Sequence, residues 1–245
     1  MFQDGPVMES PFSDIEFIKI FQQLNKENLT SIPAPISPFA EEIPLNIATE
    51  STISEEDISS LHFLKQRLCK CTKKNQVNVI LFNSPCNNDF CTQSIVQFSK
   101  LLAENGELRI LLMDCNLRNP KLHTLLHASQ QNGLSDYILG NKTIDEIISE
   151  TRQANVSLIT SGVVASNPIN LLLSNRFMQL YAQLKTRFDF ILVDSPPYHE
   201  SVDTFVLAKY LLPIVLLVVK GDARDCKNVR EIRNELTVLR VKIMS

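Results

Sequence analysis

The chain has 245 residues, of which 44% are hydrophobic and 21% are charged. These values match those of soluble globular proteins, so they exclude a wholly disordered or fibrous chain, and the length suits one α/β domain with additions. The net charge of −3 argues against a protein that coats nucleic acid, and we expect no nucleic-acid partner.

The N-terminal part of the chain differs in charge from the rest. Residues 1–59 have a net charge of −9, and since the whole chain has −3, the remainder has +6. Residues 12–24 predict a short amphipathic helix, and the prolines that follow predict an extended linker. We therefore expect an acidic N-terminal arm over residues 1–55 and a folded domain over residues 56–245. The helix either packs on its own domain or docks on another protein or subunit. Its apolar face consists of Ile15, Ile18, Phe21 and Leu24.

The six cysteines predict reduced thiols rather than a disulfide framework, because residues 1–12 lack the basic and apolar regions of a secretory signal. Cys69 and Cys71 are too close for a zinc site, and no second Cys or His pair has matching spacing. The sequence also has no apolar run near the ~18 residues that a membrane span needs.

From residue 56 onward, short apolar runs alternate with helical patterns. The runs predict strands that are buried on both faces, at 77–82, 109–114, 156–160, 190–194 and 214–219. The helical patterns begin near 56 and continue at 91–104, 133–139, 143–150, 168–186, 202–210 and 224–239. This alternation predicts an α/β fold whose mostly parallel sheet is covered by helices on both faces. Ligands of such sheets bind beyond the carboxyl ends of the strands, so the loops there form the candidate site.

Two of these strands end in an aspartate. The strand at 190–194 ends in Asp194, which Ser-Pro-Pro follows. This is a Walker B arrangement, in which the carboxylate holds Mg²⁺ or a water bound to it. The strand at 109–114 ends in Asp114, and residues 114–120 read DCNLRNP.

The second of these loops resembles the A′ motif of the bacterial tyrosine autokinases (BY-kinases), which govern capsule and exopolysaccharide synthesis. That motif has Asp-x-Asp-Leu-Arg-x-Pro and a nearby His, which match residues 114–120 and His123. The resemblance covers roughly residues 58–240. It implies a P-loop fold of the deviant-Walker class, which includes the division-site ATPases. It also implies that Asp114 and Asp194 are the catalytic carboxylates and that both, with Thr92, are the Mg²⁺ ligands. Further matches in the same order are GLSD at 133–136, Gly162, Asn-Pro at 167–168, Leu-Leu at 171–172 and DSPP at 194–197.

The loop after the first strand departs from the family. BY-kinases have S-x-x-P-G-E-G-K-[ST]-[ST] there, whereas residues 84–93 read SPCNNDFCTQ. Asn88 and Phe90 stand where the two glycines should be, and Cys91 stands where the lysine should be. The loop therefore loses the backbone that wraps phosphates and the cation that faces them. Thr92 keeps the hydroxyl on the Mg²⁺ side, and Asp89 adds negative charge.

Three further departures point the same way. The second aspartate of the A′ motif is Asn116, which cannot act as a carboxylate base. The family's E-x-x-R-x-x-R oligomerisation helix falls on Ser59, His62 and Lys65, which keep one cation. No tyrosine follows Tyr210, so we expect no tyrosine tail for autophosphorylation. The candidate nucleotide-binding residues are Ser84, Asn88, Phe90, Cys91, Thr92, Asn116 and Arg118.

Three functions stay open at this point. The departures favour a pseudokinase without enzyme activity, which binds a membrane polysaccharide co-polymerase or chain-length regulator, or an active kinase paralogue. The second is an active tyrosine autokinase or ATPase with an unusual P-loop, and the third is a localisation or partitioning factor of the same ATPase class. We expect no cofactor, or Mg-ATP or Mg-ADP if the site retains binding. The resemblance implies a cytoplasmic protein held at the bacterial inner membrane through its partner, and it leaves a homo-oligomer open.

Overall fold

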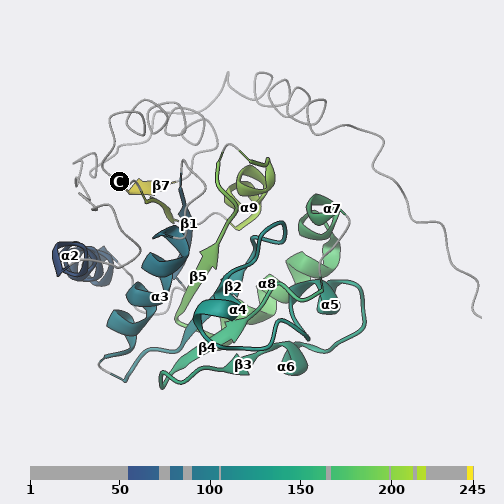
Figure 1. Cartoon of the computed structure of the whole chain (residues 1–245), viewed down its shortest axis with the longest axis horizontal. Coiled ribbons are helices and arrows are strands. Elements are labelled where there is room, and N and C mark those ends of the chain that lie inside the picture. The colour runs from purple at the N-terminus through teal and green to yellow at the C-terminus, as the bar shows by residue number, and fades with distance from the viewer. Residues whose placement is uncertain are drawn as a thin grey trace, which may run out of the picture. The chain divides into compact units, whose positions relative to one another are not determined.

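The computed structural model describes residues 55–71, 78–84, 90–104, 106–163, 167–198, 200–211, 214–218 and 242–244 (Figure 1). All of them belong to one compact unit, Glu42–Ser245. The predicted N-terminal arm, its helix at 12–24 and the predicted helix at 224–239 lie outside the described residues. The domain boundary near residue 55 therefore stays a prediction.

Helices separate most of the described strands along the chain, as the sequence predicts. The helices are α2 (Glu55–Cys71), α3 (Phe90–Ala103), α4 (Leu122–Leu125), α5 (Leu134–Ile138), α6 (Ile144–Ile147), α7 (Pro168–Leu172), α8 (Asn175–Arg187) and α9 (Asp203–Leu211). The strands are β1 (Asn78–Asn83), β2 (Ile110–Asp114), β3 (Ser149–Glu150), β4 (Val156–Ile159), β5 (Phe190–Asp194), β6 (Ile214–Leu217) and β7 (Lys242–Met244).

The strands form one sheet in the order β3-β4-β2-β5-β1-β6-β7. Neighbouring strands run parallel throughout, except that β3 pairs antiparallel with β4. Every residue of β2 and β5 is buried, because helices cover both faces of a parallel sheet. The predicted α/β fold with a mostly parallel sheet is confirmed.

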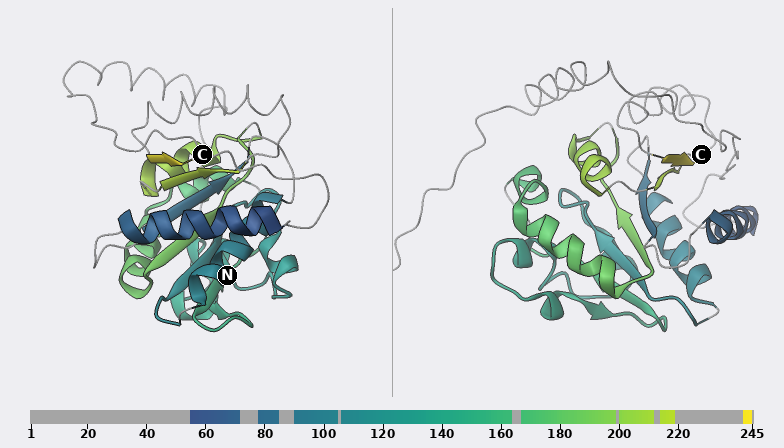
Figure 2. Two further views of the ribbon diagram at one scale, coloured as in Figure 1. Left: turned by 90° about the vertical axis from the view of Figure 1, so that its left-hand side faces the viewer. Right: turned by 180° about the vertical axis from the view of Figure 1, so that it is seen from behind.

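The helices lie on both faces of this sheet. Figure 1 shows α2 and α3 on one side and α7 and α8 on the other, and Figure 2 shows α2 crossing the outer side of its layer. The core under α3 includes Phe82 and Phe98, whose ring centroids are 5.9 Å apart and whose side chains are fully buried. None of the helices in the described part of the chain is long and apolar enough to cross a membrane.

Two sequence predictions of element boundaries are wrong. The helix expected at 143–150 ends at Ile147, because Ile148 is extended and the chain enters β3. The helix expected at 168–186 is two helices, because Ser174 starts a new one by accepting the N–H of Phe177 at 3.2 Å.

Candidate functional site

The carboxyl ends of three adjacent strands bring the predicted motifs together. β5 lies between β1 and β2, and Asp114 of β2 is the register partner of Asp194 of β5. Asp194 is also in register with Phe82 of β1, so the loop after β1 starts beside it. The sheet order therefore places the ends of β1 and β2 on either side of Asp194.

The first turn of α3 supplies the contact to Asp194. Thr92 donates its hydroxyl to Asp194 Oδ2 at 3.0 Å, and both side chains are buried. The residues expected on the Mg²⁺ side of a P-loop thus lie in contact. A hydroxyl and two carboxylates are oxygen ligands of the kind that Mg²⁺ prefers.

The A′ loop folds back over the second carboxylate. Asp114 Oδ1 accepts the N–H of Asn116 and Asp114 Oδ2 accepts the N–H of Leu122, each at 3.2 Å. Burial and the charge of Asp194 raise the pKa of Asp114 well above its usual value, against these hydrogen bonds. Burial likewise raises the pKa of Asp194, although the Thr92 hydroxyl and the charge of Lys121 lower it. The charge of Asp194 therefore disfavours a second charge on Asp114.

The position of the P-loop lysine lies in the first turn of α3 and carries Cys91. Phe90 and Cys91 are 7% and 4% exposed and pack in the hydrophobic core. Burial, with the charge of Asp194, raises the pKa of the Cys91 thiol well above its usual value, so the thiol is uncharged at neutral pH. Ser84 is buried at the end of β1, and its carbonyl accepts the N–H of Tyr198 at 3.1 Å. Asn88 lies outside the described residues.

The other two predicted nucleotide-binding residues, Asn116 and Arg118, form hydrogen bonds with other residues of the domain. Asn116 Oδ1 accepts the N–H of Asn119 at 3.1 Å and so closes a turn within the A′ loop. Arg118 forms a bidentate ion pair with Asp203 at the start of α9, with Nε–Oδ2 and Nη2–Oδ1 distances of 2.9 Å and 3.2 Å. Their role in binding nucleotide stays a prediction.

Sequence reasoning missed two residues at this site. The fully buried Asn83 ends β1, and its Nδ2 lies 3.0 Å from Ser195 Oγ, 2.8 Å from the Pro196 carbonyl and 3.1 Å from Thr204 Oγ1. It ties β1 to the Walker B turn and to α9. The signal was a polar residue at the end of an apolar strand. Lys121 is the second residue, and its position just after the LRNP segment was the signal.

This fold and this order of strands are those of a P-loop-like α/β domain. A family model described as an AAA domain matches residues 90–237. The putative tyrosine-protein kinase CapB of Staphylococcus aureus is 25% identical over 195 residues, which are 80% of this chain and 83% of CapB. The tyrosine-protein kinase wzc of Salmonella typhimurium is 37% identical over 167 residues, 68% of this chain but 22% of wzc. The solved kinase domain of the Escherichia coli tyrosine kinase ETK has a TM-score of 0.72 at 23% identity, covering 78% of this chain and 74% of that one.

The chain belongs to the bacterial tyrosine kinase (BY-kinase) family of AAA-domain proteins. It spans about a fifth of the length of the Salmonella kinases that it matches. The fold is also that of the septum site-determining protein MinD from Pyrococcus horikoshii, solved with Mg-ADP, with a TM-score of 0.58 at 20% identity. That likeness shows the fold alone. P-loop ATPases of this fold therefore include proteins that bind Mg-ADP.

The side chains at this site fit one part of a bound Mg-nucleotide, which is the metal ion. Thr92, Asp114 and Asp194 suit Mg²⁺, which would supply positive charge to phosphate oxygens. Cys91 stands at the position of the phosphate-binding lysine of the family, and its thiol is buried and uncharged. The residues present thus fit the metal better than they fit the nucleotide.

Proposed function

We propose that this protein is a catalytically inactive BY-kinase-like domain that acts in bacterial capsule or exopolysaccharide synthesis by binding a partner. The observation that carries the proposal is that the Cys91 thiol is buried and uncharged. This residue lies in the first turn of α3, next to Thr92, whose hydroxyl contacts Asp194. A kinase needs a cation at this point to offset the phosphate charge that develops in phosphoryl transfer.

The affinity for phosphate that is lost with the P-loop lysine supports the absence of kinase activity. A hydrogen bond to a charged group contributes about 2 kcal/mol, so exchanging lysine for a neutral thiol weakens binding by about 30-fold. Phe90 lies in the core where the family has a glycine, and its side chain leaves less room for backbone N–H groups to approach phosphates. Asp89 adds a negative charge to the same loop.

The second candidate is an active autokinase or ATPase. The contact between Thr92 and Asp194, with Asp114 in register beside it, favours this function, because these groups fit Mg²⁺. An active enzyme then needs a cation from another element in place of the P-loop lysine. We rank it second because phosphoryl transfer depends on that charge.

Binding to a partner gives an inactive domain a role. We propose that the partner is a membrane polysaccharide co-polymerase or an active kinase of the same family, and that this partner holds the chain at the cytoplasmic face of the inner membrane. A solved structure of the chimerical protein CapA2B2 has a TM-score of 0.70 over 78% of this chain. The acidic charge of the predicted N-terminal arm, and the apolar pattern of its predicted helix, support a role in docking.

Autophosphorylation with labelled ATP tests the proposal directly. We expect no phosphotyrosine in the purified chain, and a thermal shift of less than about a degree at millimolar Mg-ATP. Phosphotyrosine, or a shift of several degrees that Thr92→Ala abolishes, would contradict the proposal.

A repaired loop is the matched control. The triple variant Asn88→Gly, Phe90→Gly and Cys91→Lys should gain Mg-ATP affinity, because Thr92 and the two aspartates stay in place. If this variant folds and still gains nothing, the loss of function extends beyond the loop.

A further inference from the structure

Two loops of the site are held by neighbouring residues in the first turn of α9. Asp203 and Thr204 are both fully buried. Asp203 accepts two hydrogen bonds from Arg118 of the A′ loop, at 2.9 Å and 3.2 Å. Thr204 donates its hydroxyl to the carbonyl of Pro196, in the turn that follows the Walker B strand, at 2.8 Å. One helical turn therefore holds the loops that follow β2 and β5.

The end of β1 is tied to the same helical turn. Asn83 Nδ2 donates to Thr204 Oγ1 at 3.1 Å. The next residue, Ser84, accepts the N–H of Tyr198 at 3.1 Å. The ring of Tyr198 in turn lies 5.2 Å, between centroids, from the ring of Phe205 in α9. The first turn of α9 thus contacts three segments of the site that are far apart in the sequence.

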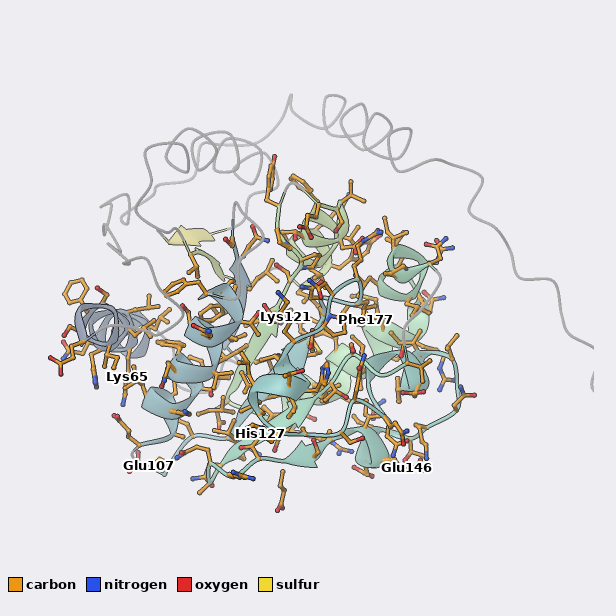
Figure 3. All side chains as sticks on the ribbon, in the orientation of Figure 1. Lys65, Glu107, Lys121, His127, Glu146 and Phe177 are labelled. Carbon is orange, nitrogen blue, oxygen red and sulfur yellow. The ribbon has the colours of Figure 1, made fainter. Side chains whose placement is uncertain are left out.

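The buried carboxylate of Asp203 links the movement of this helical turn to that of the A′ loop. If the start of α9 moved alone, Asp203 would lose Arg118 and stay unpaired in the interior, which is strongly unfavourable. Movement of α9 therefore carries the A′ loop with it. Figure 3 labels Lys121, where this loop reaches α4, near the centre of the view, whereas Glu107 and Glu146 lie at the periphery.

The hydrogen bonds around Asn83 are incomplete. Its amide nitrogen has two hydrogens but faces three acceptors, Ser195 Oγ, the Pro196 carbonyl and Thr204 Oγ1. Its Oδ1 is buried and has no hydrogen-bond partner among the described residues. A buried acceptor without a partner is unfavourable, and a partly satisfied network is weaker than a complete one. We therefore expect this network to open before the sheet does.

We propose that the first turn of α9 is a joint at which the A′ loop, the turn after β5 and the end of β1 open and close as one unit. The inference goes beyond the proposed function and does not depend on whether the domain is a kinase. Its consequence is reciprocal coupling between α9 and the loops around Asp114 and Asp194. A ligand that orders these loops also orders α9, and a partner that orders α9 also orders the loops.

Hydrogen exchange of the purified full chain, at rising urea concentrations below the unfolding transition, tests the joint. The reporters are the amides of Leu122, Tyr198 and Val206, which are hydrogen-bonded in the A′ loop, the turn after β5 and α9. They should share one opening free energy and one urea dependence, and exchange faster than the amides of β2. Unequal values among the three reporters, or values equal to those of β2, would overturn the proposal.

Thr204→Val tests the link by mutation, because it keeps the shape of the side chain and removes the hydroxyl that bonds Asn83 and Pro196. It should speed exchange in the A′ loop about tenfold, the equivalent of one hydrogen bond. Thr186→Val, which removes an exposed bond to the Gln183 carbonyl in α8, is the matched control and should leave that exchange unchanged.

The Arg118→Ala background shows whether the effect passes through α9. Arg118 is the residue of the A′ loop that bonds Asp203, so Thr204→Val should add no further acceleration in the A′ loop once Arg118 is removed. An unchanged A′ loop in Thr204→Val, or an equal acceleration with and without Arg118, would overturn the proposal. If a variant fails to fold, the urea series on the unmodified chain decides alone.

Discussion

The ion pair between the A′ loop and α9 should be strongly asymmetric in its contribution to stability. The side chain of Asp203 is 0% exposed, whereas that of Arg118 is 33% exposed. Removing Arg118 leaves a charged carboxylate in the interior. Removing the charge of Asp203 leaves a guanidinium that can turn to water. We therefore predict that Arg118→Ala destabilises the domain more than Asp203→Asn does.

The structure sets the size of both effects. Breaking a buried pair so that one charge stays unpaired costs about 3–5 kcal/mol, and the partial exposure of Arg118 places this case at about 3 kcal/mol. Asparagine at position 203 still accepts a hydrogen bond, so its cost is that of a weakened charged hydrogen bond, about 1–2 kcal/mol.

Urea unfolding followed by far-UV circular dichroism measures both free energies of unfolding. Arg187→Ala is the control, because its pair with Asp145 has side-chain exposures of 39% and 77% and should contribute at most about 1 kcal/mol. Equal costs for Arg118→Ala and Asp203→Asn, or a larger cost for Asp203→Asn, would refute the reasoning. Either result would mean that the pair does not hold the A′ loop on α9.

Three further predictions concern other parts of the chain. Gly133→Ala should lower the free energy of unfolding by about 3 kcal/mol or more, because its Cβ would lie 2.2 Å from the backbone nitrogen of Gly162; an unchanged melting temperature would contradict this. Hydrogen bonds from Thr143 lower the pKa of Glu146 from 4.5 to about 2. This stabilisation is present above the unfolded pKa and is lost as pH falls through about 2, so Glu146→Gln should lower the urea midpoint at pH 7 and less so near pH 2; a difference independent of pH would contradict it. Deleting residues 1–50 should leave the melting temperature unchanged and abolish capture of the partner, whereas an insoluble product would show that these residues belong to the fold.

Much of the fold could be predicted from local patterns. β2 and β5 are continuous apolar runs that are buried on both faces, so periodicity locates them within one or two residues. The boundaries that failed depend on weaker signals. Ser174 starts α8 through a single hydrogen bond, and β3 is two exposed residues that form a strand by pairing with β4. Such pairing has little signature in the sequence itself.

Residue type and order alone identify which residues could do chemistry at the ends of the strands. Asp114 and Asp194 end apolar strands, Thr92 lies on the Mg²⁺ side of the loop, and Cys91 stands where the family has lysine. These are properties of residue type and order, and they need no coordinates. They also predict the departure from an ordinary P-loop.

The surroundings of these residues follow from the folded chain. Arg118 meets Asp203 across 85 positions of sequence, and the sheet order places Asp194 between β1 and β2. The N–H of Leu122 meets the Asp114 carboxylate only because the A′ loop folds back over it. The physical reason is that charge and burial depend on distance in space, which strand order and loop closure set, whereas a sequence pattern records only distance along the chain.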